Sequence, residues 1–380
     1  MKFFPSFKNK KILIFCLGLL GRGVKDAIFF SEQEAEVTVT DLKNETQLKS
    51  SIEQLKPYKI KYSLGGHKEF DFLNADLIIR NAAVPLSSPF LKLAQRRKIP
   101  VDMDESLFAE YCPCPIIGIT GTRGKSTTTH LIAKILKENW ENSRRKVYLS
   151  GNIEGEATLP LIKQVKKTDL VVLELSSWQL QGFGAKKISP KIAVFTNIFP
   201  DHLNYYKTMR QYINDKKFIF QFQNRADYCV INAENNYTKN IKKEVPSRVV
   251  EFSKKDVPLS WKIALPGQHN LENISAALAV GKIFGLTKKQ MRSSVESFTG
   301  LEHRLEFVAK INDVSFINDT TSTTPIAGIL ALDSMAKPPI LIAGGATKNL
   351  NLTEFVKAIA KKTKSVILLE GTATTEIEKN

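Results

Sequence analysis

The segment Ile116-Ile-Gly-Ile-Thr-Gly-Thr-Arg-Gly-Lys-Ser-Thr-Thr-Thr129 decides the fold class of this chain. Its first five residues have the apolar character of a buried strand, and a glycine turn then leads into a helix. Glycines let backbone N–H groups turn inward, and the N-terminus of a helix carries partial positive charge. The segment therefore predicts a phosphate-binding loop in an α/β domain with a parallel sheet.

Every residue of the turn and of the first helical turn is a candidate for binding nucleotide phosphates. Lys125 would meet the terminal phosphates, and the hydroxyl of Ser126 or Thr127 would ligate Mg²⁺. A strict P-loop has a glycine five residues before Gly124, where this chain has Ile119, so the match is to the shorter G-T-x-G-K-S-T variant. The candidates are Gly121, Thr122, Arg123, Gly124, Lys125, Ser126 and Thr127.

Two further strands end in residues with metal-binding chemistry. Residues 169–179 read as a buried strand that delivers Glu174 near its C-terminal end, where ligands of α/β sheets bind. Beside a phosphate loop this carboxylate is a candidate Mg²⁺ ligand. The strand at 192–197 likewise leads into a loop with Asp201 and His202. The alternatives are a surface or helix-capping role for the carboxylate and a structural role for the histidine.

The alternation of strands and helices extends over the whole chain. Residues 10–111 read as a Rossmann-like unit, but the glycines from Gly18 to Gly23 have the order G-x-x-G-x-G, which leaves a structural turn and a diphosphate-binding turn both open. The proline-rich stretch 112–115 is typical of a domain boundary. A helix is predicted at 270–284, and strands at 11–17, 36–40, 75–79, 116–120, 170–175, 192–197, 228–232, 315–318, 340–343 and 365–369.

Length and composition exclude several protein classes. The chain has 380 residues, 43% of them hydrophobic, and a formal net charge of +17, which is typical of a globular protein of two or three domains. Its four cysteines lack metal-ligand spacing, so a disulfide scaffold or a cysteine-rich zinc site is excluded. The basic residues are scattered, which favours a solvated surface or an anionic substrate over nucleic acid. The apolar run 12–20 is too short to span a membrane, so a cytoplasmic protein is expected.

Taken together, the motifs resemble those of the Mur ligase family of peptidoglycan synthesis. The resemblance implies a Rossmann-like UDP-substrate domain (1–111), a central ATP-binding domain (112–298) and a C-terminal domain (299–380) that is also Rossmann-like. E-L-S-S-[aromatic]-Q-L and G-L-x-H-R point to the D-glutamate-adding members. The matching segments are G-T-R-G-K-S-T (121–127), G-N-I (151–153), E-L-S-S-W-Q-L (174–180), T-N-I-F-P-D-H (196–202), G-Q-H-N-L-E-N (267–273), G-L-E-H-R-L-E (300–306), N-D-T-T-S-T-T-P (318–325) and A-G-G-A-T-K (343–348).

The resemblance implies an ATP-dependent amide ligase that adds D-glutamate to UDP-N-acetylmuramoyl-L-alanine through an acyl phosphate. ATP and two Mg²⁺ ions are the implied cofactors. A cytoplasmic monomer is expected, without nucleic acid and without membrane insertion. The alternatives are a nucleotide-binding homologue without D-glutamate ligase activity, a related Mur or folylpolyglutamate-type ligase for another amino acid, and a DNA-associated P-loop ATPase.

The family's site residues can be carried over by position. Lys125 would bind ATP phosphates, Glu174 one Mg²⁺ and His202 a second. Lys216, four residues after Tyr212, would be carbamylated, which turns a cation into an anion beside the metal. Lys217 is the fallback, and a solvated helix lysine is the alternative. The remaining implied contacts are Gly18, Asp41 and Asn152 for the muramoyl substrate, Asn270 or its neighbour His269 for adenine, Arg304 and Asp319 for ATP phosphate and ribose, and Lys348 for D-glutamate or, equally well, as an exposed lysine of a glycine turn.

The chain departs from the family pattern in three places. Arg123 stands where many members have asparagine. The segment Arg80-Asn-Ala-Ala-Val-Pro85 replaces a Ser-Pro-Gly-like turn, which bears on UDP recognition. The sequence ends at Asn380, before a serine- and phenylalanine-bearing segment that binds D-glutamate in the family. A short C-terminal domain and an incomplete acceptor pocket are therefore expected.

Overall fold

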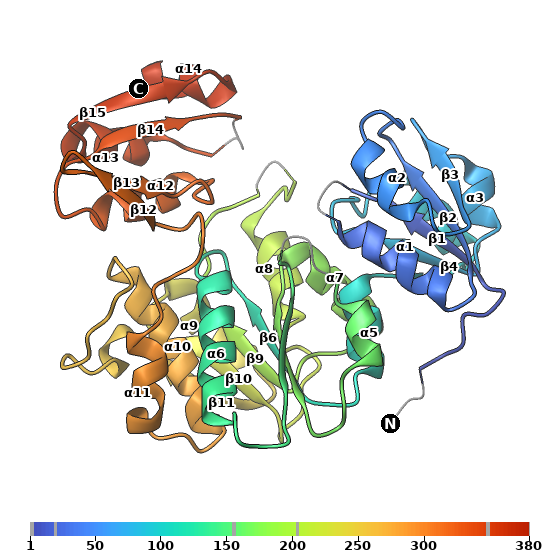
Figure 1. Ribbon diagram of the computed structural model, residues 1–380, viewed down its shortest axis with the longest axis horizontal. Coiled ribbons are helices and arrows are strands. Elements are labelled where there is room, and N and C mark those ends of the chain that lie inside the picture. Colours follow the sequence, from blue (N-terminus) through green and yellow to red (C-terminus); the bar gives the residue numbers. More distant parts are fainter. Residues whose placement is uncertain (1–3, 19–20, 154–156, 203–204, 347–349, 380) are drawn as a thin grey trace. The chain divides into compact units, whose positions relative to one another are not determined.

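The computed structural model (Figure 1) describes residues 4–18, 21–153, 157–202, 205–346 and 350–379. The chain divides into two compact units. The first comprises residues 1–118, 143–193 and 215–227, and the second comprises residues 119–142, 194–214 and 228–380. The predicted boundary at residues 111 and 112 falls between a helix and the strand of the phosphate loop, and the three-domain division stays a prediction.

A five-stranded parallel sheet occupies the N-terminal part of the first unit. Its strand order β3-β2-β1-β4-β5 places β1 at the centre, between β2 and β4. This is a doubly wound arrangement, in which ligands bind beyond the carboxyl ends of the strands where the order reverses. The elements are β1 (Lys11–Phe15), α1 (Arg22–Glu32), β2 (Glu36–Asp41), α2 (Lys49–Leu55), β3 (Ile60–Leu64), α3 (Glu69–Leu73), β4 (Leu77–Arg80), α4 (Pro89–Arg96), β5 (Val101–Asp102) and α5 (Asp104–Tyr111).

A six-stranded sheet follows, with the strand order β11-β10-β9-β6-β8-β7. The pairs β7–β8 and β10–β11 are parallel. The strands are β6 (Ile116–Thr120), β7 (Val147–Gly151), β8 (Leu170–Glu174), β9 (Ile192–Phe195), β10 (Tyr228–Asn232) and β11 (Arg248–Phe252). The helices are α6 (Lys125–Asn139), η1 (Leu159–Lys163), α7 (Ser177–Lys186), α8 (Met209–Lys217), α9 (Asn236–Ile241), η2 (Lys242–Glu244), η3 (Lys254–Asp256), α10 (His269–Ile283) and α11 (Lys288–Glu296).

The last 75 or so residues of the second unit form two strand pairs with helices between them. The first pair is antiparallel and the second is parallel. The helices α12 and α13 pack against each other beside them. The elements are β12 (Glu306–Ile311), β13 (Val314–Asn318), α12 (Pro325–Asp333), β14 (Ile340–Gly344), α13 (Thr353–Lys362), β15 (Ser365–Leu369) and α14 (Thr372–Lys379).

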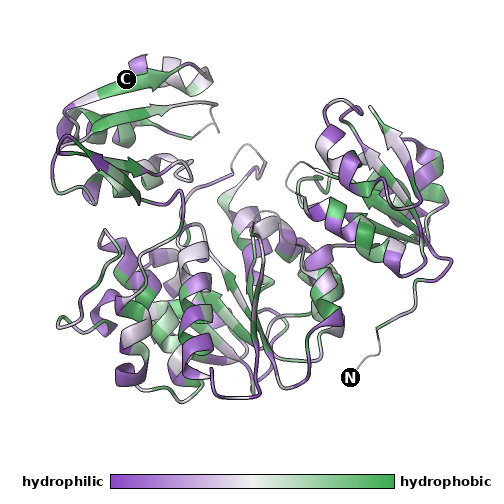
Figure 2. Ribbon diagram, viewed as in Figure 1, coloured by the Kyte–Doolittle hydropathy of each residue, from purple (hydrophilic) through white to green (hydrophobic). Residues whose placement is uncertain are grey.

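The core follows the expected division between strands and helices. Figure 2 shows mostly hydrophobic residues on the strands of the two large sheets and hydrophilic residues on the surrounding helices. All five residues of β6 and all five of β8 are buried, as expected for parallel strands covered on both faces. The predicted α/β fold class is thereby confirmed. Among the described residues, none of the helices is long and apolar enough to cross a membrane.

Candidate active site

The loop between β6 and α6 has the shape of a phosphate cradle. Gly121 has φ of 155°, and a Cβ there would lie 1.9 Å from the Thr196 hydroxyl oxygen. Gly124 caps α6 in a left-handed conformation with φ of 74°, and a Cβ would lie 2.0 Å from Oδ1 of Asn273. Both positions require glycine. The predicted glycine turn at the start of a helix is therefore present.

The residues Thr196 and Asn197 hold this loop from the end of β9. The backbone N–H of Arg123 donates to Oδ1 of Asn197 at 2.8 Å, and the N–H of Thr122 donates to the Asn197 carbonyl at 3.0 Å. The Arg123 carbonyl accepts from the Thr196 hydroxyl at 2.7 Å and from Nδ2 of Asn197 at 3.2 Å. These four bonds explain why Thr-Asn follows the strand, and they fix the loop backbone.

Side chains of the loop make local contacts as well. Nζ of Lys125 donates to the Thr122 carbonyl at 3.0 Å. The Thr122 hydroxyl lies 3.1 Å from the Tyr212 hydroxyl and accepts from the N–H of Phe199 at 2.9 Å. Burial raises the pKa of Tyr212, so it stays protonated and able to donate. The helix α8 is thus joined to the loop through Tyr212.

The loop borders an open cleft of about 650 Å³ in the second unit. Its lining combines loop residues with the start of α10 and with residues of the C-terminal strands, and it includes most of the positions predicted to bind ATP. The charged and polar lining residues are Arg123, Thr127, His269, Asn270, Asn273, Arg304, Asp319, Thr321 and Ser322. The structure therefore brings these residues together along one cleft.

Arg304 contacts the phosphate loop, and Asp319 contacts the backbone of the residue that follows Arg304. Nη2 of Arg304 donates to the Ser126 hydroxyl at 3.0 Å. A hydroxyl oxygen has two lone pairs, so this bond leaves Ser126 able to accept once more or to ligate a cation. Asp319 accepts from the N–H of Leu305 at 3.0 Å and from the Ser322 hydroxyl. Both predicted nucleotide contacts thus border the same cleft.

The start of α10 supplies the predicted adenine contacts. Nδ2 of Asn270 donates to the Pro266 carbonyl at 2.6 Å, and its Oδ1 accepts from Asn273 at 2.8 Å. Burial lowers the pKa of His269, while Asp319 acts in the opposite direction. The imidazole is therefore mostly neutral at pH 7 and has one donor and one acceptor nitrogen.

In the first unit, Glu174 ends β8 and is buried, with 2% of its surface exposed. Its Oε1 accepts from Nδ2 of Asn152 at 3.2 Å, and the Glu174 carbonyl accepts from the Asn152 N–H at 2.8 Å. Its Oε2 is buried and has no hydrogen-bond partner among the described residues. A buried carboxylate oxygen without a partner is costly unless a cation or a donor meets it. This residue fits a Mg²⁺ ligand, as predicted.

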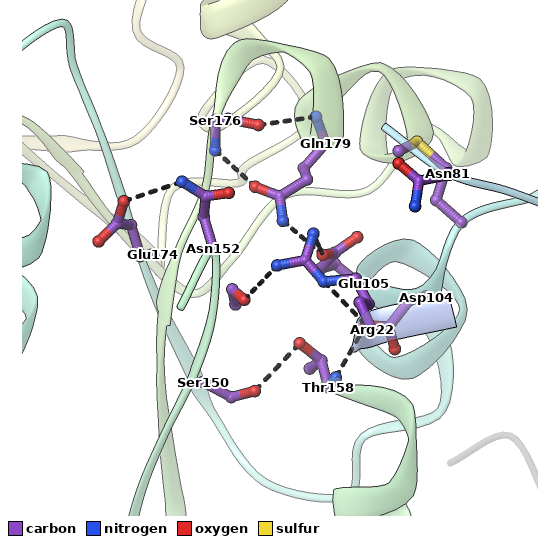
Figure 3. A network of polar contacts seen from close by, with 12 residues as sticks. Arg22, Asn81, Asp104, Glu105, Ser150, Asn152, Thr158, Glu174, Ser176 and Gln179 are labelled. Carbon is purple, nitrogen blue, oxygen red and sulfur yellow. Dashed lines mark hydrogen bonds and ion pairs between the residues drawn. The ribbon is translucent and has the colours of Figure 1, made fainter. Parts of the chain in front are cut away.

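An arginine network surrounds Glu174 and Asn152 in the first unit (Figure 3). Nη2 of Arg22 donates to the Gly151 carbonyl at 2.8 Å, and its Nη1 lies 3.1 Å from Oε1 of Glu105. Its Nε lies 3.9 Å from Oδ2 of Asp104. Glu105 also accepts from Nε2 of Gln179, the residue that closes the N-terminal capping box of α7. The glycine turn of α1 is thereby joined to the Gly151-Asn152 turn.

This network holds several carboxylates out of water. Asp104 accepts from the N–H groups of Thr158 and Leu159. Burial and the neighbouring Glu105 raise the pKa of Asp104 to about 7, and burial also raises the pKa of Asp26. No sequence pattern singled out these residues. The one available signal was Arg22 itself, because a cation in the first turn of a helix opposes the helix dipole and calls for an acidic partner.

The other predicted residues belong to both units, His202 to the second and Gly18, Asp41 and Lys216 to the first. His202 has φ of 54°, and its Nε2 lies 3.7 Å from Oδ2 of Asp201. Lys216 lies in α8 and is 1% exposed, which is incompatible with a solvated surface lysine. The N–H of Gly18 donates to Oδ2 of Asp41 at 3.2 Å, so these two substrate candidates are in contact. Lys348 lies outside the described residues.

Comparisons with known proteins identify the family of this chain. Residues 119–259 match the family model described as the Mur ligase middle domain. A UDP-N-acetylmuramoylalanine–D-glutamate ligase of Roseiflexus is 36% identical over 98% of this chain and 85% of the relative. The protein of that name in Clostridioides difficile is 34% identical over 97% of this chain and 85% of the relative.

Solved structures show the same fold at lower identity. A UDP-N-acetylmuramate-alanine ligase of Thermotoga maritima matches with a TM-score of 0.62 and 18% identity, over 98% of this chain and 88% of that one. A MurF ligase from the same organism, in complex with ADP, matches with a TM-score of 0.58 and 18% identity, over 98% and 90% of the two chains. This chain belongs to the Mur ligase family, and within it to the D-glutamate ligases.

Proposed function

We propose that this chain is an ATP-dependent ligase that joins D-glutamate to UDP-N-acetylmuramoyl-L-alanine. The observation that carries the proposal is its similarity, over 98% of its length, to proteins named for that product. The phosphate loop and its cleft support the use of ATP. The reaction would belong to peptidoglycan precursor synthesis in the cytoplasm, where ATP is available.

The proposed reaction has two steps. A carboxylate oxygen of the UDP-linked substrate attacks the γ-phosphorus of ATP, and the bond from phosphorus to the ADP oxygen breaks, which gives an acyl phosphate and ADP. The amine of D-glutamate then attacks the acyl carbon. The amide bond forms, phosphate leaves and the amine loses a proton. Neither step needs a covalent enzyme nucleophile, since phosphate activates the carbonyl.

The chain's own residues supply charge and position. Lys125 and the N–H groups of the loop would bind phosphate oxygens. Arg304 and Asp319, which line the same cleft, would bind ATP phosphate and ribose, and Asn270 would contact the adenine. Gly18, Asp41 and Asn152 would bind the UDP-linked substrate. Glu174 would hold one Mg²⁺ and His202 a second, and the Ser126 hydroxyl is a further candidate ligand. When bound, the ions would offset the charge that builds up on the phosphoryl oxygens.

Lys216 is proposed to be carbamylated. Its burial supports this assignment, because the alternative of a solvated helix lysine requires an exposed side chain. A carbamate replaces a buried cation by an anion that can orient or ligate Mg²⁺. Among the described residues, no group of three or more His, Cys, Asp or Glu side chains is arranged so that it could hold a metal ion. Ligands of other kinds, such as a carbamate and phosphate oxygens, would therefore complete a Mg²⁺ site.

Product formation tests the proposal. The chain is incubated with Mg-ATP, UDP-N-acetylmuramoyl-L-alanine and D-glutamate, and the products are separated and weighed by mass spectrometry. The expected result is one condensed product per ADP released. With ¹⁸O in the substrate carboxylate, one labelled oxygen should appear in inorganic phosphate. L-Glutamate and D-alanine serve as matched acceptor controls, and equal use of either would contradict the assignment to D-glutamate.

A further inference from the structure

Arg123, in the variable position of the phosphate loop, has side-chain donors that no described residue of the chain accepts from. Its Nε and Nη2 atoms are buried and lack a hydrogen-bond partner among the described residues. These two nitrogens lie on the same edge of the planar guanidinium, the edge that forms paired bonds with two oxygens of one anion. Leaving such an edge buried and unpaired is costly, so the observation points to an anionic ligand.

The backbone of Arg123 is fixed while its side chain borders the cleft. Four hydrogen bonds from Thr196, Asn197 and the loop hold the main chain on either side of this residue. The side chain helps to line the open cleft together with Thr127 and Arg304. Arg123 therefore borders the cleft from a backbone that is held in place, as a preorganised charge requires.

The balance of charges around Arg123 favours the binding of an additional anion. The carboxylates of Asp201 and Asp319 act to stabilise the guanidinium, and Arg304 acts against it. Burial nevertheless dominates and lowers the pKa of Arg123 below its ordinary value. A ligand with several negative charges, bound between Arg123 and Arg304, would compensate for the desolvation of the Arg123 guanidinium. It would also reduce the repulsion between the two arginines.

We propose that Nε and Nη2 of Arg123 bind two oxygens of the γ-phosphoryl group of ATP, which makes Arg123 a catalytic residue. The inference rests on the proposed function, because it assigns the arginine to the phosphoryl transfer of that reaction. As the phosphorus–oxygen bond to ADP breaks, negative charge spreads over the transferred group. Arg123 keeps its proton throughout and acts through charge and paired hydrogen bonds, where Lys125 offers a point charge.

Nucleotide binding and turnover of three proteins test this assignment. They are the parent, Arg123→Asn and Arg123→Lys, each as the full chain. Calorimetry measures binding of Mg-ADP and of the β,γ-imido analogue of ATP. For Arg123→Asn, we expect the analogue to bind about tenfold more weakly and ADP to bind within threefold of the parent. Turnover should fall about 100-fold, and Arg123→Lys should lie between the two. Added guanidinium should restore part of the turnover of Arg123→Asn.

Arg144→Asn is the matched control, because it removes the same charge from an exposed position. It should leave binding and turnover unchanged. The proposal is overturned if Arg123→Asn binds the analogue as the parent does and turns over within threefold of it. It is also overturned if ADP and the analogue weaken equally, since the guanidinium would then act on other phosphates. A parent that makes no D-glutamate product contradicts the proposed function alone, and the binding measurements still decide the role of Arg123.

Discussion

Two arginines flank left-handed glycines at the starts of helices, and they differ in what meets them. Arg22 follows Gly21 at the start of α1, and Arg123 precedes Gly124 at the start of α6. The guanidinium of Arg22 contacts a carbonyl and two buried carboxylates of its own unit. Two nitrogens of Arg123 are buried without a partner in the described part of the chain. The first arginine is satisfied by the fold, whereas the second needs a ligand.

The largest expected effect concerns the phosphate loop, the region of Arg123 that needs a ligand. Lys125→Ala should lower ATP-dependent turnover at least about 100-fold, which corresponds to roughly 3 kcal/mol of transition-state stabilisation. ADP release in the presence of all substrates measures the effect. Lys137→Ala is the control, because Lys137 is an exposed lysine of the same helix. Turnover close to that of the parent would refute the phosphate-loop assignment.

Lys216→Ala should lower turnover by about 10- to 100-fold, the range expected for groups that support a metal ligand. Short-chain carboxylic acids such as acetate should restore part of it, because a free carboxylate can occupy the vacated position. In the parent, ¹³C-bicarbonate should give a carbamate signal by NMR that Lys216→Ala lacks and that Lys217→Ala keeps. A Lys216→Ala protein as active as the parent would exclude the carbamate.

Arg22, whose guanidinium has its partners within the fold, should contribute to the stability of the folded chain. Arg22→Met leaves Asp104 and Glu105 buried without their cation, so the free energy of unfolding should fall by about 3 kcal/mol. Urea unfolding followed by circular dichroism measures this change. Arg144→Met removes an exposed charge and should change the free energy by less than about 0.5 kcal/mol. Equal stability of Arg22→Met and the parent would show that the network contributes nothing.

A smaller effect concerns the pH dependence of stability. The pKa of Asp104 is raised to about 7 in the folded chain, against about 3.9 in an unfolded one. Between these values the folded state holds a proton that the unfolded state has lost, so stability is lost as the pH rises from about 4 to 7. Asp104→Asn should flatten this slope in urea titrations. A steeper slope in the variant would contradict the assignment.

Within the two large sheets, the sequence predicts interior strands better than edge strands. The predicted strand at 116–120 coincides with β6, and those at 170–175 and 228–232 match β8 and β10 closely. In these sheets the strands β3, β5, β7 and β11 were missed, and each lies at the edge of its sheet. An edge strand is covered less completely than an interior one, so its apolar signal is weaker; β11, for example, has one fully buried residue.

In the candidate active site, too, the sequence predicts some features and misses others. The phosphate loop and Glu174 follow from local patterns, because their residue types are adjacent in the sequence. Arg22 donates to Gly151, which lies 129 positions away, and a local pattern carries no trace of such a partner. Likewise, the sequence identified Arg123 as a departure from the family, but only the structure shows that its Nε and Nη2 are buried and unpaired.

One measurement tests the contrast between the two arginines directly. Urea unfolding of the parent, Arg22→Met and Arg123→Met is compared with and without the β,γ-imido analogue of ATP. Without nucleotide, Arg123→Met should be at least as stable as the parent, since the substitution removes a buried unpaired charge, and Arg22→Met should be clearly less stable. With nucleotide, the parent and Arg22→Met should gain stability, and Arg123→Met should gain much less. A loss of stability in nucleotide-free Arg123→Met as large as that in Arg22→Met would contradict the account.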